Sequence, residues 1–309
     1  MLIKNPPVEV TEDLMMLGTN EYPFFLFKGK DEGAIFEGGI SSMAPILGEQ
    51  LAELGINTDY ITQLVITHAH PDHVMAVPAI RELIPGMSVL ASAAAAKTVS
   101  IEKVMGFFGK ADAGFNEAMF SRGAISEPSE GMSSVGTIAV DRVLKEGDKV
   151  AGSFDVLEMR GHSECGLCFH NPDSGILIVS DTTGYYLPDD DNRWATYFDG
   201  YGATLESIQR LATLDAEALC LGHNVVIKGA DDIKAYFDEA LSAHEAYHAR
   251  IIEELKAGKS KRDIAGQLGV EAYEMSRLQP VGFFQKTCGL LVSMSMQHEG
   301  MSEDNGSQA

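Results

Sequence analysis

Imidazoles and a carboxylate are closely spaced in the stretch THAHPDH, which begins at Thr67. It follows the apolar run ITQLVIT, which has the composition of a buried strand. Alternate residues of an extended segment share a face, so His68 and His70 can point at one metal ion. Asp72 and His73 lie just beyond, where the chain turns into a helix, and can point at a second ion. Such ligands together suit zinc, iron or manganese.

Three further candidate ligands follow predicted strands later in the chain. GHSECG contains His162, GILIVSD ends at Asp181, and EALCLGH ends at His223. Loops at strand ends often carry functional groups, because the sheet holds them rigidly. Asp181 could bridge two ions, and two ions about 3.5–4 Å apart can share a hydroxide that is nucleophilic at neutral pH. We therefore predict seven metal ligands, of which Asp72 and Asp181 are also catalytic: His68, His70, Asp72, His73, His162, Asp181 and His223.

A competing motif, HEAYH, runs from His244 to His248 and fits the H-E-x-x-H pattern of helical zinc proteases. It lies in a stretch of helical periodicity, where positions i and i+4 share a face. One five-residue match without an assignable third ligand is weaker than four ordered motifs that carry seven ligands. We therefore favour the site at the strand ends, although either histidine could line a substrate pocket.

The composition limits the partners of the protein. The 309 residues are 45% apolar and 22% charged, as in globular proteins, and the formal net charge of −22 disfavours nucleic acid. No apolar stretch approaches the ~18–20 residues of a membrane helix, and the N-terminus lacks the apolar run of a signal peptide. We expect no membrane partner, a cytoplasmic location, and four reduced cysteines.

The order of predicted elements indicates a layered α/β protein with a helical C-terminal addition. We predict an α/β domain over residues 1–230, a helical cap over 231–298, and a disordered polar tail over 299–309. Residues 93–131, rich in Ala, Met, Phe and Gly, are expected to form helices and a mobile loop, and the sequence leaves open whether they form a lid.

The four motifs, in this order, resemble the metallo-β-lactamase superfamily over about residues 13–224. The resemblance implies an αββα sandwich with the site along one edge. It also implies two metal sites and a bridging ligand: His68, His70 and His162 for the first ion, Asp72, His73 and His223 for the second, and Asp181 between them.

Three positions depart from the pattern of that superfamily. Met75 and Asn224 stand where members usually have glycine, which puts the local helix packing near Met75 in doubt. Glu37 replaces the more usual aspartate, and we interpret it as a group that orients a ligating histidine.

The stretch over residues 22–42, the strand MSVLAS and the helical C-terminal segment are also similar to the quinolone-signal response thioesterases. That similarity implies a dinuclear iron site and an aroylacetyl-coenzyme A type thioester. We expect a hydrolase with two divalent metal ions that uses a bridging hydroxide on a small molecule, an acyl thioester (such as one of coenzyme A) or a related ester. Lactones and phosphodiesters stay open, as do a homodimer and the alternative of a metal-binding regulatory or sensor protein.

Overall fold

The computed structural model describes residues 1–126 and 136–301, and the chain divides into two compact units. The first unit comprises Met1–Glu158, Cys165–Ser180 and Asp215–Ile233. The second comprises Met159–Glu164, Asp181–Leu214 and the chain from Lys234 onward.

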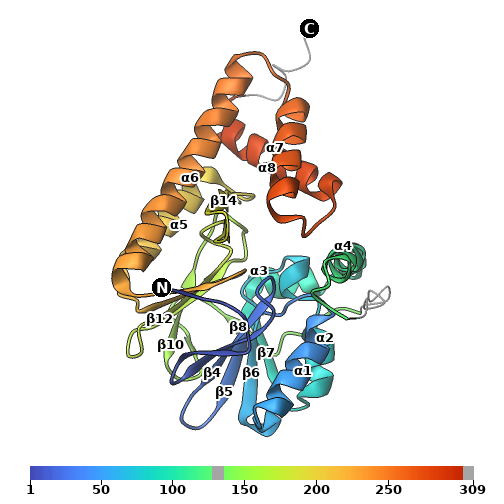
Figure 1. Cartoon of the computed structure of the whole chain (residues 1–309), viewed down its shortest axis with the longest axis vertical. Coiled ribbons are helices and arrows are strands. Elements are labelled where there is room, and N and C mark those ends of the chain that lie inside the picture. The colour runs from blue at the N-terminus through green and yellow to red at the C-terminus, as the bar shows by residue number, and fades with distance from the viewer. Residues whose placement is uncertain (127–135, 302–309) are drawn as a thin grey trace. The chain divides into compact units, whose positions relative to one another are not determined.

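The first unit contains two seven-stranded β-sheets (Figure 1). One sheet has the order β2-β3-β4-β5-β6-β7-β8: β2 (Val8–Thr11), β3 (Leu14–Gly18), β4 (Pro23–Lys28), β5 (Gly33–Phe36), β6 (Ile61–Val65), β7 (Ser88–Ser92) and β8 (Arg142–Leu144). The other has the order β1-β16-β15-β12-β11-β10-β9: β1 (Leu2–Ile3), β16 (Val226–Lys228), β15 (Ala218–Leu221), β12 (Ile176–Ser180), β11 (Leu167–Asn171), β10 (Phe154–Glu158) and β9 (Lys149–Val150). β5 to β8 run parallel, as do β12 and β15, and the other pairs are antiparallel.

The core of the first unit contains side chains of both sheets. The ring of Phe36 on β5 lies 4.9 Å from that of Phe154 on β10 and 5.0 Å from that of Phe169 on β11. All three are fully buried, and burial stabilises the fold by roughly 1.5–3 kcal/mol for each such side chain. The predicted fold class, a mixed α/β protein with two sheets and a C-terminal helical region, is confirmed.

Helices also form part of the first unit. They are α1 (Met43–Glu53), η1 (Thr58–Tyr60), η2 (Pro71–His73), α2 (Val77–Leu83), α3 (Ala93–Val99) and α4 (Glu102–Ser121). α2 begins at Val77, after the short turn η2 that contains Asp72 and His73. Pro78 occupies its first turn, where the N–H that proline lacks has no helical partner. Helices are confirmed within the segment 93–131, but its part from residue 127 lies outside the described residues.

The second unit is mainly helical. It contains a short hairpin, α5, most of α6, α7 and α8: β13 (Tyr185–Leu187), β14 (Asn192–Trp194), α5 (Tyr201–Leu211), α6 (Ala230–Lys256), α7 (Lys261–Ser276) and α8 (Val281–His298). Buried apolar side chains of α7 and α8 share one core, which includes Leu268, Phe284 and Leu291. The predicted tail falls largely on residues 302–309, which lie outside the described residues, and the boundary at residue 230 stays a prediction.

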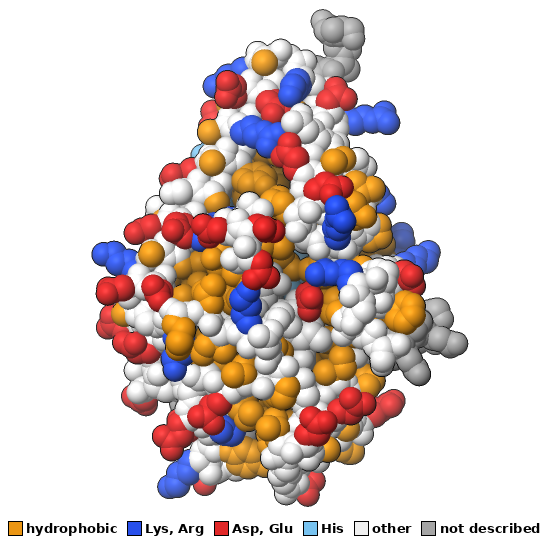
Figure 2. Space-filling view, viewed as in Figure 1, with side chains coloured by type: hydrophobic (Ala, Val, Ile, Leu, Met, Phe, Trp, Pro, Cys, Tyr) orange, Lys and Arg blue, Asp and Glu red, His pale blue; other side chains and the backbone are white. Residues whose placement is uncertain are grey.

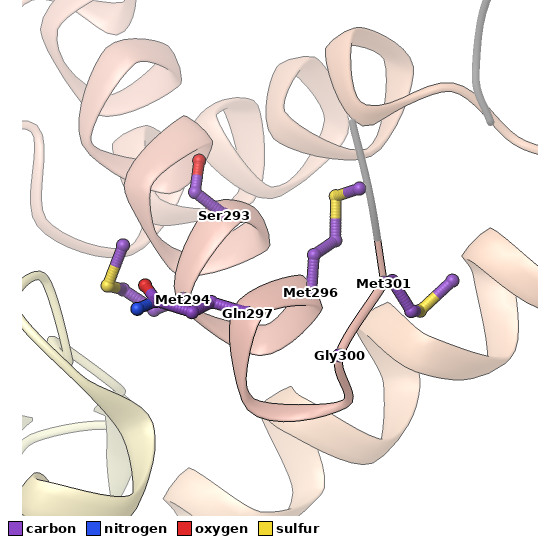
Figure 3. Close-up of a pocket in the computed structure, with 6 residues that line it drawn as sticks. All are labelled: Ser293, Met294, Met296, Gln297, Gly300 and Met301. Atoms are coloured by element: carbon purple, nitrogen blue, oxygen red, sulfur yellow. The ribbon is translucent and has the colours of Figure 1, made fainter. Parts of the chain in front are cut away.

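The surface carries charges of both signs, and a pocket lies in the second unit. On the face drawn in Figure 2, Asp and Glu side chains are scattered among Lys, Arg and hydrophobic side chains. The pocket, of about 400 Å³, lies at the end of α8 (Figure 3), and six residues line it: Ser293, Met294, Met296, Gln297, Gly300 and Met301. Within the described parts of the chain, no helix is both long and apolar enough to span a membrane.

Candidate metal centre

Five of the predicted ligands belong to the first unit, and all five lie just after a strand end. The segment after β6 carries four of them, and the segment after β15 carries the fifth: His68, His70, Asp72, His73 and His223. The two segments lie at neighbouring strand ends. Thr67 Oγ1, just after β6, lies 3.0 Å from Ser180 Oγ at the end of β12. β12 is the parallel neighbour of β15, the strand that precedes His223.

Asp72, His73 and His223 form one compact group. Asp72 Oδ2 lies 3.7 Å from Nε2 of His73 and 3.7 Å from Nε2 of His223. One ligand atom from each residue lies within 4.8 Å of the other two, a spacing that an ion could bridge. Both imidazoles are at most 4% exposed.

His68 and His70 lie beside this group. His68 Nε2 is 3.1 Å from His70 Nδ1, so one ion could contact both nitrogens. The ring of His68 is centred 4.1 Å from that of His73. The five predicted ligands of the first unit are therefore brought together.

Hydrogen bonds assign the tautomers of two of these histidines. His73 Nδ1 lies 2.7 Å from Glu37 Oε2, and His223 Nδ1 lies 2.5 Å from the carbonyl oxygen of Glu21. Both partners are acceptors, so each Nδ1 carries the hydrogen and each Nε2 keeps a lone pair for a metal ion. The contact expected of Glu37 is present.

His162 and Asp181 belong to the second unit and lie close to each other. His162 Nε2 is 3.7 Å from Asp181 Oδ2, and both residues are buried. His162 Nδ1 is 2.9 Å from the carbonyl oxygen of Thr196, which again leaves the Nε2 lone pair for a ligand. Imidazole and carboxylate, the two kinds of ligand among the predicted residues, suit divalent zinc, iron or manganese.

Three residues beside the ligands have positive backbone φ angles that residues other than glycine rarely adopt. These are Glu37 (φ 81°), Ser180 (φ 49°) and Asn224 (φ 72°). Asparagine tolerates this region better than most residues, which explains how Asn224 replaces the usual glycine after His223. Backbone strain of this kind is concentrated at functional sites.

The turn that carries Asp72 and His73 packs tightly against the loop after β5. A Cβ atom on Gly38 would lie 2.3 Å from the carbonyl oxygen of His73, so only glycine fits there. Met75, where the superfamily usually has glycine, is fully buried and donates its N–H to the carbonyl oxygen of Gly39 at 2.9 Å. The larger residue is accommodated in the core.

The competing histidines of HEAYH have other surroundings. Buried His244 donates through Nδ1 to the carbonyl oxygen of Ala240 at 2.7 Å, and His248 stacks on Tyr201 at 3.9 Å. In residues 1–126 and 136–301, no group of His, Cys, Asp or Glu spaced to hold an ion includes either histidine. The protease interpretation finds no support.

Some supporting groups have no signal in the sequence. The carbonyl oxygens of Glu21 and Thr196 hold histidines through the backbone, which any residue type could provide. A buried polar network of Ser41, Asp112 and Asn116 was also missed, because Ser41 lies 71 to 75 residues from its two partners.

Comparisons with known proteins identify the family of this chain. Residues 22–223 match the family model of the metallo-beta-lactamase superfamily. A metallo-beta-lactamase family protein from Thermus thermophilus is similar at 20% identity, with 94% of this chain and 95% of that chain covered and a TM-score of 0.64.

Two other solved structures share the fold. A stereoselective inverting sec-alkylsulfatase from Pseudomonas sp. is 14% identical, with 97% of this chain and 51% of that chain covered and a TM-score of 0.64. A metallo-beta-lactamase from Cronobacter sakazakii is 15% identical, with 80% of this chain and 98% of that chain covered and a TM-score of 0.57. At these identities the structures show the fold alone, but the family model covers most of the chain, and this protein belongs to the metallo-beta-lactamase superfamily.

Proposed function

We propose that the protein is a dinuclear metal-dependent hydrolase whose substrate is an acyl thioester or a related ester. The observation that carries the proposal is the convergence of two Nε2 lone pairs on one carboxylate. His73 and His223 each present Nε2 at 3.7 Å from Asp72 Oδ2, while their Nδ1 atoms are held by acceptors. Such an arrangement is typical of metal ligands.

The ligand set of the proposed centre includes His162 and Asp181 as well. Asp181 directly follows Ser180, whose hydroxyl lies 3.4 Å from Nδ1 of His68. Consecutive Cα atoms are about 3.8 Å apart, so chain connectivity supports a ligand role for Asp181. His162 fits the same role because its Nδ1 faces the carbonyl oxygen of Thr196.

When bound, two divalent ions supply a Lewis acid for the scissile carbonyl and lower the pKa of water toward neutrality. The residues of the chain contribute geometry and proton transfer. Glu37 fixes the ring of His73, and the carbonyl oxygen of Glu21 fixes that of His223. We assign proton transfer to the carboxylate of Asp72, whose side chain is 13% exposed.

The choice of a thioester follows from leaving-group chemistry. A thiolate leaves without a strong general acid, whereas an alkoxide or amine needs a proton donor. The site described above contains imidazoles whose hydrogens are committed to acceptors, together with carboxylates. These groups suit a reaction in which little acid catalysis is required.

A substrate panel tests the proposal. Protein loaded with zinc, iron or manganese would be assayed on an acyl-coenzyme A thioester, a lactone, a phosphodiester, an alkyl sulfate ester and a β-lactam. We expect the thioester to give the highest kcat/KM, and Asp72→Ala to lower it by about 100-fold or more.

A metal-loaded protein that turns over none of the five classes would contradict the hydrolase proposal and favour the regulatory alternative. Faster turnover of another substrate class, with that activity lost in Asp72→Ala, would support the hydrolase proposal but reject a thioester as the preferred substrate.

A further inference from the structure

The loop between β5 and α1 (residues 37–42, called here the β5–α1 loop) supports the turn that bears two of the predicted ligands. Its first residue, Glu37, accepts from His73 Nδ1 at 2.7 Å. The carbonyl oxygens of its two glycines accept the N–H groups of Met75 at 2.9 Å and Ala76 at 3.0 Å, just beyond the ligands. The position of the β5–α1 loop therefore sets the position of η2, the turn that carries the predicted ligands Asp72 and His73.

The far end of the same loop is held by two side chains of α4. Asp112 Oδ1 accepts the N–H of Ser41 at 2.9 Å, and its Oδ2 accepts the hydroxyl of Ser41 at 2.5 Å. Asn116 Oδ1 accepts the N–H of Ser42 at 3.3 Å. The amide of Asn116 in turn donates to Asp112 Oδ2 at 3.0 Å and to Ser41 Oγ at 2.8 Å.

The two α4 side chains of this network are buried. Asp112 is 0% exposed and Asn116 1% exposed, so both side chains depend on the β5–α1 loop and on each other for hydrogen bonds. Networks of this kind rigidify a structure when every member is satisfied and are costly when one member is removed. α4 also packs against η2, the turn that contains Asp72 and His73.

Asp112 is electrostatically linked to the ligand group as well. Burial raises the pKa of the Asp112 carboxyl, hydrogen bonds from Ser41 and Asn116 oppose this rise, and the charge of Asp72 adds to it. Two carboxylates that repel each other are both stabilised when a cation binds beside one of them.

We propose that Asp112 and Asn116 are positioning residues for the metal centre: by holding Ser41 and Ser42 they fix the β5–α1 loop against the turn that carries Asp72 and His73. This inference rests on the proposed metal-dependent function. It assigns to α4 a role in metal affinity beyond its packing on the sandwich.

The test measures zinc affinity by competition with a chromophoric chelator, together with the unfolding temperature of the metal-free protein. Asp112→Asn keeps the side-chain shape but places an amide where donors from Ser41 and Asn116 converge. We expect Asp112→Asn to weaken the binding of the more weakly held zinc ion by about 10-fold or more, and Asn116→Ala to have a similar effect. Ser41→Ala removes the hydroxyl but keeps the hydrogen bond from the Ser41 backbone N–H to Asp112, so it should weaken zinc binding by a smaller factor. It replaces Asp112→Asn in the test if that variant does not fold.

The matched control is Asn171, another buried amide, at the end of β11. Its Oδ1 accepts the N–H groups of Asp173 at 3.2 Å and Ser174 at 3.3 Å. Leu167 at the other end of β11 contacts Thr67, so Asn171 lies about 13 Å along the strand from the ligand segment. Asn171→Ala should lower the unfolding temperature and leave zinc affinity unchanged.

Two outcomes would overturn the inference. Zinc affinity within twofold of wild type in Asp112→Asn and Ser41→Ala, with a lower unfolding temperature as in Asn171→Ala, would show that the network is only structural. A wild-type protein that binds none of zinc, iron and manganese would overturn the proposed function, and this inference with it.

Discussion

Glu37 Oε2 lies 2.7 Å from His73 Nδ1, and both residues are at most 2% exposed. Thr67 Oγ1 donates to the same carboxylate oxygen at 3.0 Å. The buried carboxylate therefore fixes the ring and the tautomer of His73, whose other nitrogen faces Asp72. Glu37, which stands where the superfamily usually has aspartate, makes this contact from a backbone with φ 81°.

The first prediction concerns this pair. Glu37→Gln should weaken zinc binding by about 10- to 100-fold, because a neutral amide holds the imidazole less strongly than a carboxylate. Competition titration measures the change. Glu32→Gln is the control, since Glu32 contacts Thr62 and Gln63 at the opposite end of β5. Equal affinities in the two variants would show that Glu37 does not orient a ligand.

The second prediction tests the close approach of the β5–α1 loop. Gly38→Ala should destabilise the protein by about 1–3 kcal/mol, because the new methyl group would lie 2.3 Å from the carbonyl oxygen of His73. Denaturant unfolding measures this difference. Gly86→Ala is the control, as a Cβ there meets no atom within 4 Å. A Gly38→Ala protein as stable as Gly86→Ala would mean that the β5–α1 loop shifts to accommodate the methyl group at little cost in free energy.

The third prediction concerns the backbone beside His223. Asn224 has φ 72°, so Asn224→Ala should lower the unfolding free energy by about 1 kcal/mol more than Asn224→Gly does. Both variants lose the same amide, so the difference between them reports the backbone alone. Identical stabilities in urea would contradict the left-handed conformation.

The fourth prediction uses the buried His244. Desolvation lowers the pKa of His244 from 6.5 to about 4, while its bond to the carbonyl oxygen of Ala240 partly opposes the shift. The folded state therefore binds the proton less well than the unfolded chain, and stability present above pH 6.5 is lost as the pH falls toward 4. The shift corresponds to roughly 3 kcal/mol.

Unfolding free energies measured between about pH 7 and pH 4 check this expectation. Wild type should lose more stability over that range than His244→Leu, which cannot titrate at this position. A variant that retains the whole wild-type pH dependence would show that His244 is not the group responsible.

Much of this arrangement is readable from local sequence patterns. The strand before His68 and the alternation of His68 with His70 predicted a site at the end of β6, and the first unit holds five predicted ligands close together. Those residues are near strand ends, so local patterns locate them well.

The supporting groups depend on distant contacts. Asp112 has the sequence surroundings of an ordinary polar residue in a helix, and nothing near it in the chain indicates that it contacts Ser41. The chain was expected to turn into a helix at Asp72 and His73, but these residues lie in η2, a separate short turn that precedes α2. Backbone carbonyl partners such as that of Glu21 have no sequence signature at all.

The central claim is that the predicted ligands form a dinuclear metal centre. Elemental analysis of protein purified without added metal, compared with an Asp181→Ala variant, tests it most directly. We predict about two divalent ions per chain in wild type and a loss of both in the variant, whose folding would be verified by circular dichroism. A wild-type protein with no bound metal, even after incubation with zinc, iron or manganese, would contradict the claim.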